Sequence, residues 1–207
     1  IARNIEESEL RYKMFVQQST EGIWRIELDE AKPVSTPIEE MISYCMNNAC
    51  VAECNDAFAK IYGYENAGEI IGQPLIKLMP PEHPANYLLL EQFFTNSFKL
   101  EGGLSFEYDK EGNEYVFVNN MIGIIEAGYI KSAWGTQRNI TNQKKAEQLL
   151  LASEEQYRYL FNNNPSCIFI WDPETMQILE VNQASVNLYG YSRNEFLQLT
   201  ALDIRPV

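Results

Sequence analysis

The sequence predicts an α+β fold, and three observations support that class. Between residues 22 and 139 the predicted order is two strands, three or four short helices and then three strands. The strands are short runs of apolar, β-branched and aromatic residues bounded by turn residues. A ten-residue phrase also occurs twice, as NDAFAKIYGY at 55–64 and as NQASVNLYGY at 182–191. A repeat of this kind predicts a second copy of the same structural unit.

The first copy supplies every element of that order. Strands are predicted in GIWRIEL and ACVAEC. Asn55 then suits the N-cap of a short helix, because its side chain can accept hydrogen bonds from the free amides of the first turn. NAGEIIGQPLIKLMPP predicts a short helix ended by glycine and proline, and ANYLLLEQFFTNS predicts a longer helix. Two strands follow around the turn DKEGN, and the third strand begins after Gly128.

The spacing of the repeats predicts an insertion in the first copy. The Tyr-Gly-Tyr triplets are 127 residues apart, whereas the matching phrases ELRYKMF and EQYRYLF are 146 apart, so about 19 residues are inserted. In this stretch Thr36, Pro37 and Glu39 have the form of a capping box with proline at the first helical position. The insertion is therefore predicted to hold one amphipathic helix packed on the domain, with a functional lid as the alternative. Its apolar positions at helical spacing are Ile38, Met41, Ile42 and Cys45.

The second copy predicts a hairpin, with strands in CIFIWD and QILEV around a turn at PET. Asn182 then suits a helix N-cap, and Gly190 ends that helix. Between the copies, a helix is predicted with a seam for packing or dimerising. The seam residues are Ala146, Leu149, Leu150, Ser153, Tyr157 and Leu160.

Charge and composition disfavour several classes of function. The net charge of −13 would be repelled by nucleic acid and by anionic lipid, and no apolar run approaches the roughly 18 residues of a membrane helix. The four cysteines form no C-x-x-C pair, and there is one histidine, so reduced thiols in a cytosolic protein are expected rather than a metal site. No phosphate-binding loop or nucleophile elbow is present, so the chain is not expected to be an enzyme.

Two phrases carry a resemblance to a known family. ECNDAFAKIYGYENAGEIIGQPL and WGTQRNIT resemble the opening and closing blocks of PAS sensor domains, as found in tandem in bacterial sensor histidine kinases. The resemblance implies a five-stranded antiparallel sheet with helices on one face and a small cavity between them. Asn139 stands where the family usually has aspartate, and it can still cap the outgoing helix but carries no charge. The implied organisation is a helical lead-in at 1–8, a complete PAS domain at 9–142 with a helical insertion at about 29–48, a linker helix at 143–156 and the first half of a second PAS domain at 157–207.

The implied cavity would be lined by the long helix and the inner face of the sheet. Strand alternation places Phe117, Asn119 and Met121 on one face and Asn120 on the other, so either Asn119 or Asn120 points inward. The candidate lining residues are Met79, Tyr87, Leu90, Phe94, Phe106, Phe117, Asn119 and Trp134. For the aromatic members of this set, core packing is the favoured role, because a fold of a sheet against helices requires an aromatic core.

The sequence does not identify a cofactor, and none is expected. Oxygen-sensing PAS domains place a haem ligand near His83, but Pro84 puts this histidine before the helix rather than on it. The light-sensing subgroup has a flavin-reactive cysteine after the short helix, where this chain reads IIGQPLIKLM. Neither haem nor flavin is therefore expected, and His83 is a metal ligand only if haem binds.

The resemblance implies a cytoplasmic, non-enzymatic fragment of a bacterial signalling protein, such as a sensor histidine kinase or, next, a diguanylate cyclase. It implies a sensory module that binds a small ligand or relays a signal; a pure dimerisation module is the alternative and a haem-based gas sensor the weaker one. The expected partners are a small molecule and a second copy, held through the helix at 140–160 or the partial second domain. Because that domain lacks three strands, it is expected to need a partner for order, with Ile168, Phe169, Ile170 and Trp171 exposed.

Overall fold

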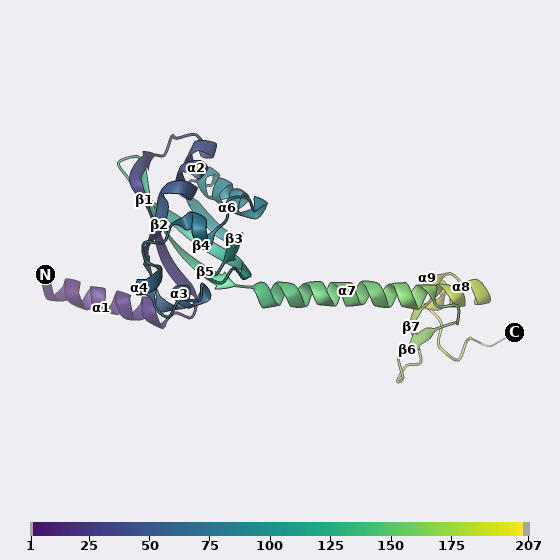
Figure 1. Ribbon diagram of the computed structural model, residues 1–207. Helices are drawn as coiled ribbons and strands as arrows, with labels where there is room; N and C mark the ends of the chain where they lie inside the picture. The colour runs from purple at the N-terminus through teal and green to yellow at the C-terminus, as the bar shows by residue number, and fades with distance from the viewer. Residues whose placement is uncertain (1, 205–207) are drawn as a thin grey trace. The chain divides into compact units, whose positions relative to one another are not determined.

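The computed structural model describes residues 2–204 and divides into two compact units, residues 1–144 and 145–207 (Figure 1). Residue 1 and residues 205–207, at the ends of the predicted ranges, lie outside the described residues. The α+β class and the five-stranded antiparallel sheet are confirmed. Within the described part of the chain, no helix combines the length and the apolar character needed to cross a bilayer.

The first unit is built on one sheet with the strand order β2-β1-β5-β4-β3. Each pair of neighbouring strands is antiparallel; β5 is the central strand, and β1 lies between β2 and β5. The alternation predicted for β4 is present: Phe117, Asn119 and Met121 are buried, whereas Asn120 is exposed. The strands are β1 (Gly22–Pro33), β2 (Ala49–Cys54), β3 (Lys99–Tyr108), β4 (Glu114–Glu126) and β5 (Tyr129–Asn139).

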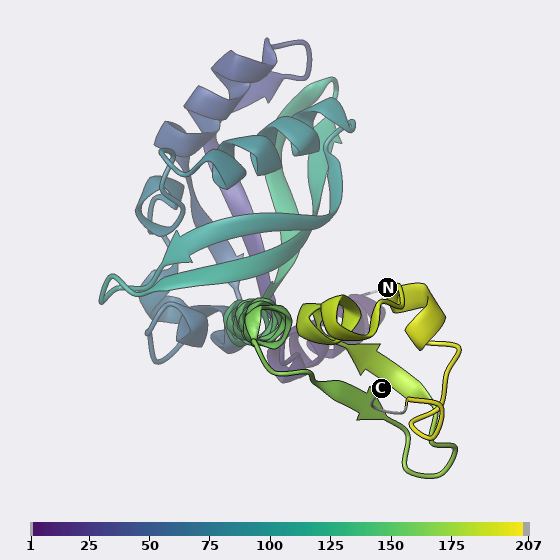
Figure 2. The same ribbon diagram turned by 90° about the vertical axis from the view of Figure 1, so that its right-hand side faces the viewer.

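Helices cover one face of this sheet, with α6 lying across it (Figure 2). Their buried side chains meet those of the inner sheet face in a single apolar core. The helices between β1 and β3 are α2 (Ile38–Asn48), α3 (Asp56–Ile61), α4 (Ala67–Ile70), α5 (Leu75–Leu78) and α6 (Pro84–Thr95). A further helix, α1 (Ala2–Gln18), precedes β1 and includes both the predicted lead-in and the first residues of the predicted domain.

The inserted segment differs from its prediction in two ways. Its first residues extend β1 to Pro33, which pairs with Tyr129 of β5, so the helix occupies only the second part of the insertion. The capping box is wrong: Pro37 occupies the N-cap, and the Thr36 hydroxyl donates instead to the carbonyl of Pro33 at 2.8 Å. The turn from Pro33 to Thr36 uses that hydroxyl, and the helix begins one residue later. Because α2 buries Met41, Ile42 and Met46 in the common core, it packs as a structural helix.

A buried asparagine, which the sequence did not single out, fixes α6 to the sheet edge. The Asn86 side chain accepts from the backbone amide of Phe106 at 2.8 Å and donates to the carbonyl of Phe106 at 2.7 Å. It also donates to the carbonyl of Pro80 at 2.9 Å. Since β3 is an edge strand, this amide satisfies backbone groups that would otherwise lack partners.

The sheet leads directly into helix α7 (Thr141–Asn163). The Asn139 side chain accepts from the backbone amide of Thr141 at 2.9 Å, so it caps the start of this helix as predicted. The Thr141 hydroxyl accepts from the amide of Val116 on β4 at 2.9 Å, and the amide of Ile140 donates to the Val116 carbonyl. The first turn of α7 is thereby tied to two strands. The helix is one continuous element through Asn163 and is longer than the linker predicted at 143–156.

The second unit contains the predicted hairpin and short helices. Phe169 packs on Ile178, Val181 and Phe196, so the expectation that it is exposed is wrong. Strand alternation gives the reason for the first two residues, because Phe169 faces the helices and Ile170, on the opposite face, is 37% exposed. Trp171 follows a shift in the pairing register and is 47% exposed. The elements are β6 (Phe169–Trp171), β7 (Ile178–Val181), α8 (Gln183–Tyr189) and α9 (Arg193–Phe196).

The repeated phrase has the same structural role in both units. In the first, Oδ1 of Asn55 accepts from the amides of Ile23 and Phe58, and Nδ2 donates to the carbonyls of Val16 and Glu21. All four distances lie between 2.9 and 3.0 Å. One buried side chain therefore caps α3 and ties it to the first strand and the segment before it.

Asn182 makes the equivalent contacts in the second unit. Its Oδ1 accepts from the amides of Ile168 and Ser185, and its Nδ2 donates to the carbonyls of Asn164 and Ser166. Both asparagines also donate their backbone amide to the first strand of their hairpin. This shared set of four side-chain hydrogen bonds, called here the asparagine clamp, explains why the phrase begins with asparagine in each copy.

Candidate ligand-binding cavity

A cavity of about 70 Å³ lies in the core of the first unit, between the inner face of the sheet and helices α2, α5 and α6. Its walls are almost entirely apolar. Sites for drug-sized ligands enclose roughly 300–1,000 Å³, so this cavity fits a molecule of only a few non-hydrogen atoms. The lining residues are Trp24, Ile26, Cys45, Phe58, Leu75, Leu78, Met79, Leu89, Leu90, Phe93, Glu107, Asn119, Met121 and Ala133.

Three of the eight predicted lining residues line this cavity: Met79 before α6, Leu90 on α6 and Asn119 on β4. Asn119 is the inward asparagine, and its Nδ2 donates to the Ser105 hydroxyl at 2.8 Å. The prediction that one of two adjacent asparagines turns inward is therefore confirmed. The amide is satisfied by protein, which favours the structural role for it.

Two of the candidates on α6, Tyr87 and Phe94, do not line the cavity, because the helix turns a different set of positions towards it. Tyr87 is 41% exposed. Phe94 is buried, but its ring lies against Phe93 and Phe98 rather than in the cavity wall. The cavity faces Leu89, Leu90 and Phe93, which form a stripe next to the one predicted.

The three remaining aromatic candidates do not line this cavity either. The partly buried Phe106 stacks on the His83 ring at 4.0 Å, and the buried Phe117 packs on Tyr62, so both rings are engaged outside the cavity. Trp134 contacts Tyr12 of α1 and does not line the cavity. Strand alternation explains its position, because its neighbour Ala133 lines the cavity and Trp134 must then face the other way.

A chain of polar side chains at the cavity wall is centred on Glu107 of β3, which is only 5% exposed. One carboxyl oxygen accepts from the Tyr62 hydroxyl and the other from the Ser105 hydroxyl. Gln137 Nε2 in turn donates to the Tyr62 hydroxyl at 2.8 Å. Burial raises the pKa of Glu107, although the hydrogen bonds that it accepts act to lower it. The same burial and the nearby carboxyl raise the pKa of Tyr62 well above its usual value.

Trp24, one of the lining residues, carries an unsatisfied polar atom. Its side chain is buried, and Nε1 is the single buried side-chain nitrogen or oxygen without a hydrogen-bond partner among the described residues. An unpaired buried donor costs about 1–3 kcal/mol. Such atoms are rare in native proteins, so each one calls for a physical explanation.

Neither Glu107 nor Trp24 could be singled out from sequence. Charged residues are seldom fully buried, so a lone glutamate in a predicted strand is expected to face solvent. The available signal was alternation, since Ser105 and Glu107 fall on the same face of LSFEY. Trp24 offered a similar signal, because it alternates with Ile26 in the first strand and both line the cavity.

His83, the side chain considered as a haem ligand, is engaged outside the cavity. His83 forms the N-cap of α6, where Nδ1 accepts from the Ala85 amide at 3.3 Å, and it does not line the cavity. His83 therefore does not fit a haem ligand in this cavity. Cys45 does line the cavity, but burial raises the pKa of its thiol to about 12, so it remains a protonated, weak nucleophile at neutral pH. The described residues contain no cluster of three or more histidine, cysteine, aspartate or glutamate side chains suited to a metal ion.

Comparisons with known proteins agree with this architecture. The family model described as PAS fold matches residues 40–140, and a second, described as PAS domain, matches residues 155–206. A curated relative, the methyl sulfide methyltransferase-associated sensor of Methanosarcina acetivorans, is 34% identical over 62 residues, which are 30% of this chain. The matched segment covers 6% of that relative's length.

Two solved structures resemble the chain at low identity. An RNA-binding Light-Oxygen-Voltage receptor superposes with a TM-score of 0.50 at 17% identity over 73% of this chain and 39% of its own. A sensory box histidine kinase/response regulator from Burkholderia thailandensis gives a TM-score of 0.48 at 16% identity, over 72% of this chain and 99% of its own. With two successive family matches on the sheet-and-helix units described above, the chain belongs to the PAS domain family.

Proposed function

We propose that the first PAS domain is the sensory module of a cytoplasmic prokaryotic signalling protein, such as a sensor histidine kinase, and that it has no catalytic activity of its own. In this proposal a small molecule binds the core cavity of the first unit, and its presence is relayed to α7. The name of the Methanosarcina acetivorans relative, a sensor, supports the signalling role.

The observation that carries the proposal is the pairing of an apolar cavity with an unsatisfied polar atom on one of its lining residues. Empty cavities in proteins are apolar, so an apolar lining alone does not indicate a polar ligand. Here the wall includes Trp24, whose Nε1 lacks a partner, and the buried carboxyl of Glu107. A few convergent polar groups in an apolar pocket are typical of ligand sites.

The path for the relay is short. Ala133 of β5 lines the cavity, and β5 ends at Asn139, two residues before Thr141, where α7 begins. The start of α7 is held by the side chain of Asn139 and by the contact between Thr141 and Val116. A shift of β5 on ligand binding would therefore act directly on the first turn of the helix.

Methyl NMR on methionine-labelled protein tests the proposal. Met79 and Met121 line the cavity, whereas Met176 lies in the second unit and serves as an internal control. We expect a screen of small compounds to find some that move both cavity signals saturably and leave Met176 unchanged. Ala133→Leu, which fills the cavity from β5, should abolish the response. A broad screen without one saturable binder would contradict ligand sensing.

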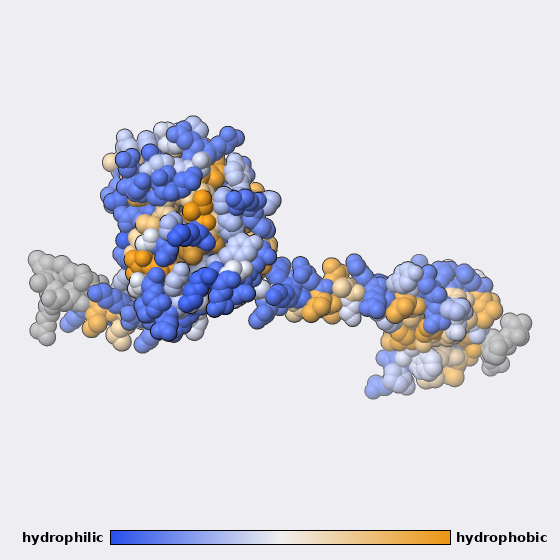
Figure 3. Space-filling model, in the orientation of Figure 1, coloured by the Kyte–Doolittle hydropathy of each residue, from blue (hydrophilic) through white to orange (hydrophobic). Residues whose placement is uncertain are grey.

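A second candidate function, self-association, is favoured by a separate observation on α7. Leu149, Leu150 and Leu160, three of the predicted seam residues, are 72%, 71% and 59% exposed. Figure 3 shows apolar side chains interrupting the hydrophilic surface of this helix. Exposed leucines at near-heptad spacing are suited to pairing with a second copy. Sedimentation velocity over a range of concentrations tests this function independently of the cavity.

A further inference from the structure

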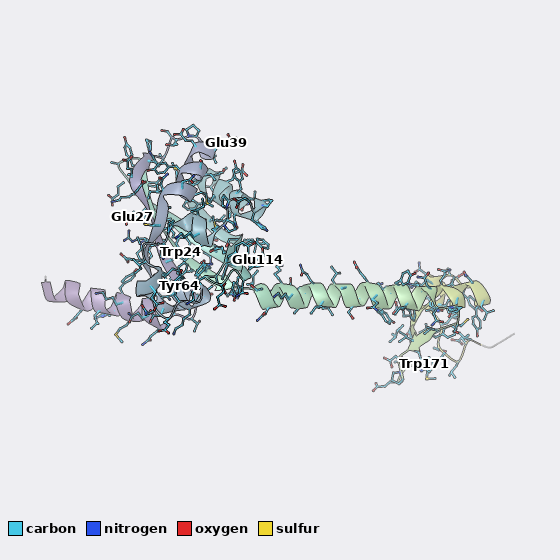
Figure 4. All side chains as sticks on the ribbon, in the orientation of Figure 1. Trp24, Glu27, Glu39, Tyr64, Glu114 and Trp171 are labelled. Carbon is cyan, nitrogen blue, oxygen red and sulfur yellow. The ribbon has the colours of Figure 1, made fainter. Side chains whose placement is uncertain are left out.

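We propose that the cavity of the first unit takes a small, uncharged molecule bearing a hydroxyl or primary amide group, which accepts a hydrogen bond from Nε1 of Trp24 and donates one to the carboxyl of Glu107. This inference rests on the proposed ligand-sensing function and names the chemical class of the ligand. Figure 4 labels Trp24 within the first unit.

The donor in this site is the indole of Trp24. The residue is 7% exposed, and Nε1 has no acceptor among the described residues. Its ring lies closely over Gly135 of β5, since a Cβ added there would lie 2.6 Å from both Cε2 and Cη2 of the indole. A ligand oxygen is the simplest partner for this N–H group.

The acceptor is the carboxyl of Glu107. Each of its oxygens already accepts one hydroxyl, from Tyr62 or from Ser105. A carboxylate offers about four lone-pair positions, so capacity for another donor remains. Its two hydroxyl donors and the side chain of Gln137 behind Tyr62 hold the group in a fixed position. Glu107 and Trp24 both line one cavity of about 70 Å³, so a molecule of a few atoms can reach both.

The polar pair also excludes other classes of ligand. An ammonium ion has no lone pair for the Trp24 donor, which would stay unpaired. A carboxylate ion would bring only acceptor oxygens against a carboxyl group whose oxygens accept from Tyr62 and Ser105, so it could donate no hydrogen bond to Glu107. A hydrocarbon of the same size would leave the donor of Trp24 unsatisfied. An uncharged molecule with one acceptor and one donor satisfies both groups.

The test is a titration of the full 207-residue chain with three matched probes: 1-propanol, propylammonium and propionate. The readout is the indole N–H signal of Trp24 in ¹H–¹⁵N NMR spectra, identified by its loss in Trp24→Phe. The indole signals of Trp134 and Trp171 are internal controls, since neither residue lines the cavity. We expect 1-propanol to move the Trp24 signal saturably and the two ions to leave it unchanged. For a ligand of about four non-hydrogen atoms, the dissociation constant should be roughly tens of micromolar or weaker.

Variants test the hydrogen bond from Trp24 and the volume of the cavity separately. Trp24→Phe removes the donor and should weaken 1-propanol binding about tenfold, followed by the methyl signals of Met79 and Met121. Trp134→Phe, on the other face of the sheet, is the matched control and should bind normally. Because Trp24→Phe could disturb folding, Ala133→Leu provides a second test, and it should abolish binding by filling the cavity.

The outcomes distinguish the proposed ligand class from ligand binding by the cavity as such. Saturable movement of the Trp24 signal by 1-propanol alone supports the inference. Equal or stronger saturable binding of propylammonium or propionate overturns the ligand class while leaving ligand sensing intact. If no probe moves the Trp24 indole signal, the inference is wrong; the methionine-methyl screen then decides separately whether the cavity binds any ligand.

Discussion

Trp24 of β1 and Gly135 of β5 are paired directly across the sheet, and the indole ring lies over the glycine. A Cβ at position 135 would approach Cε2 and Cη2 of that ring to 2.6 Å, far inside van der Waals contact. The absence of a side chain at Gly135 therefore leaves room for the ring of Trp24, a residue that lines the cavity. The glycine of WGTQRNIT has this steric role in the first unit.

Gly135→Ala is expected to destabilise the first unit by about 1–3 kcal/mol, because the new methyl group must displace a buried ring. Chemical denaturation of the variant and the wild type measures the effect. In a Trp24→Leu background the obstructing ring is gone, so the cost of Gly135→Ala should shrink. An equal cost in both backgrounds would show that the ring contact is not the cause.

Asn55→Ala is expected to cost about 3 kcal/mol of unfolding free energy, more than an ordinary helix cap. The substitution removes the capping bond to Phe58 and leaves the amide of Ile23 and the carbonyls of Val16 and Glu21 without their partner. Asn66→Ala is the matched control, because Asn66 caps α4 through one exposed bond to Gly68 and should cost less than about 1 kcal/mol. Similar thermal midpoints for the two variants would argue against the clamp.

Glu107 should make the stability of the first unit depend on pH. Burial raises the pKa of its carboxyl in the folded chain above the usual value of 4.5. Its stabilising contribution is therefore complete below the unfolded pKa and is lost as pH rises through the folded pKa. Relative to wild type, Glu107→Gln should gain stability with rising pH, by at most about 1.4 kcal/mol per unit. Denaturation from pH 4.5 to 8 measures this difference, with exposed Glu114→Gln as control; a flat difference would mean that the folded pKa is not raised.

The exposed leucines of α7 predict self-association through this helix. Leu149→Glu together with Leu150→Glu should shift any dimer towards monomer, because charges replace the apolar seam. Glu155→Gln, on the same helix but outside the seam, is the control. Sedimentation velocity reports the change. A wild-type chain that stays monomeric at high concentration would remove α7 as a dimerisation surface.

The order of strands and helices could be predicted because each element carries its own local signal. The strands are bounded by turns such as DKEGN, and Asn55 and Asn182 mark helix starts by hydrogen bonding that involves only neighbouring residues. The structure of the insertion could not be predicted in full, because the extension of β1 to Pro33 depends on its pairing with Tyr129, which is remote in sequence. Local patterns cannot report such a pairing.

The cavity was predicted only in part, for the same reason. Met79, Leu90 and Asn119 were recognised from helix and strand periodicity. Glu107 and Trp24 depend on which residues lie across the core from them, and that is set by tertiary packing. Phe106 and Phe117 show the opposite case, since both were candidates for the wall but pack against His83 and Tyr62.

The central claim is that occupancy of the cavity is transmitted through β5 to the start of α7. Amide hydrogen exchange across residues 129–163, measured with and without a compound that saturates the methyl signals of Met79 and Met121, tests it most directly. We predict a several-fold change in exchange within the first turn of α7, where the Lys144 amide donates to the Ile140 carbonyl, and none in Ala133→Leu. A filled cavity with unchanged exchange across α7 would contradict the claim.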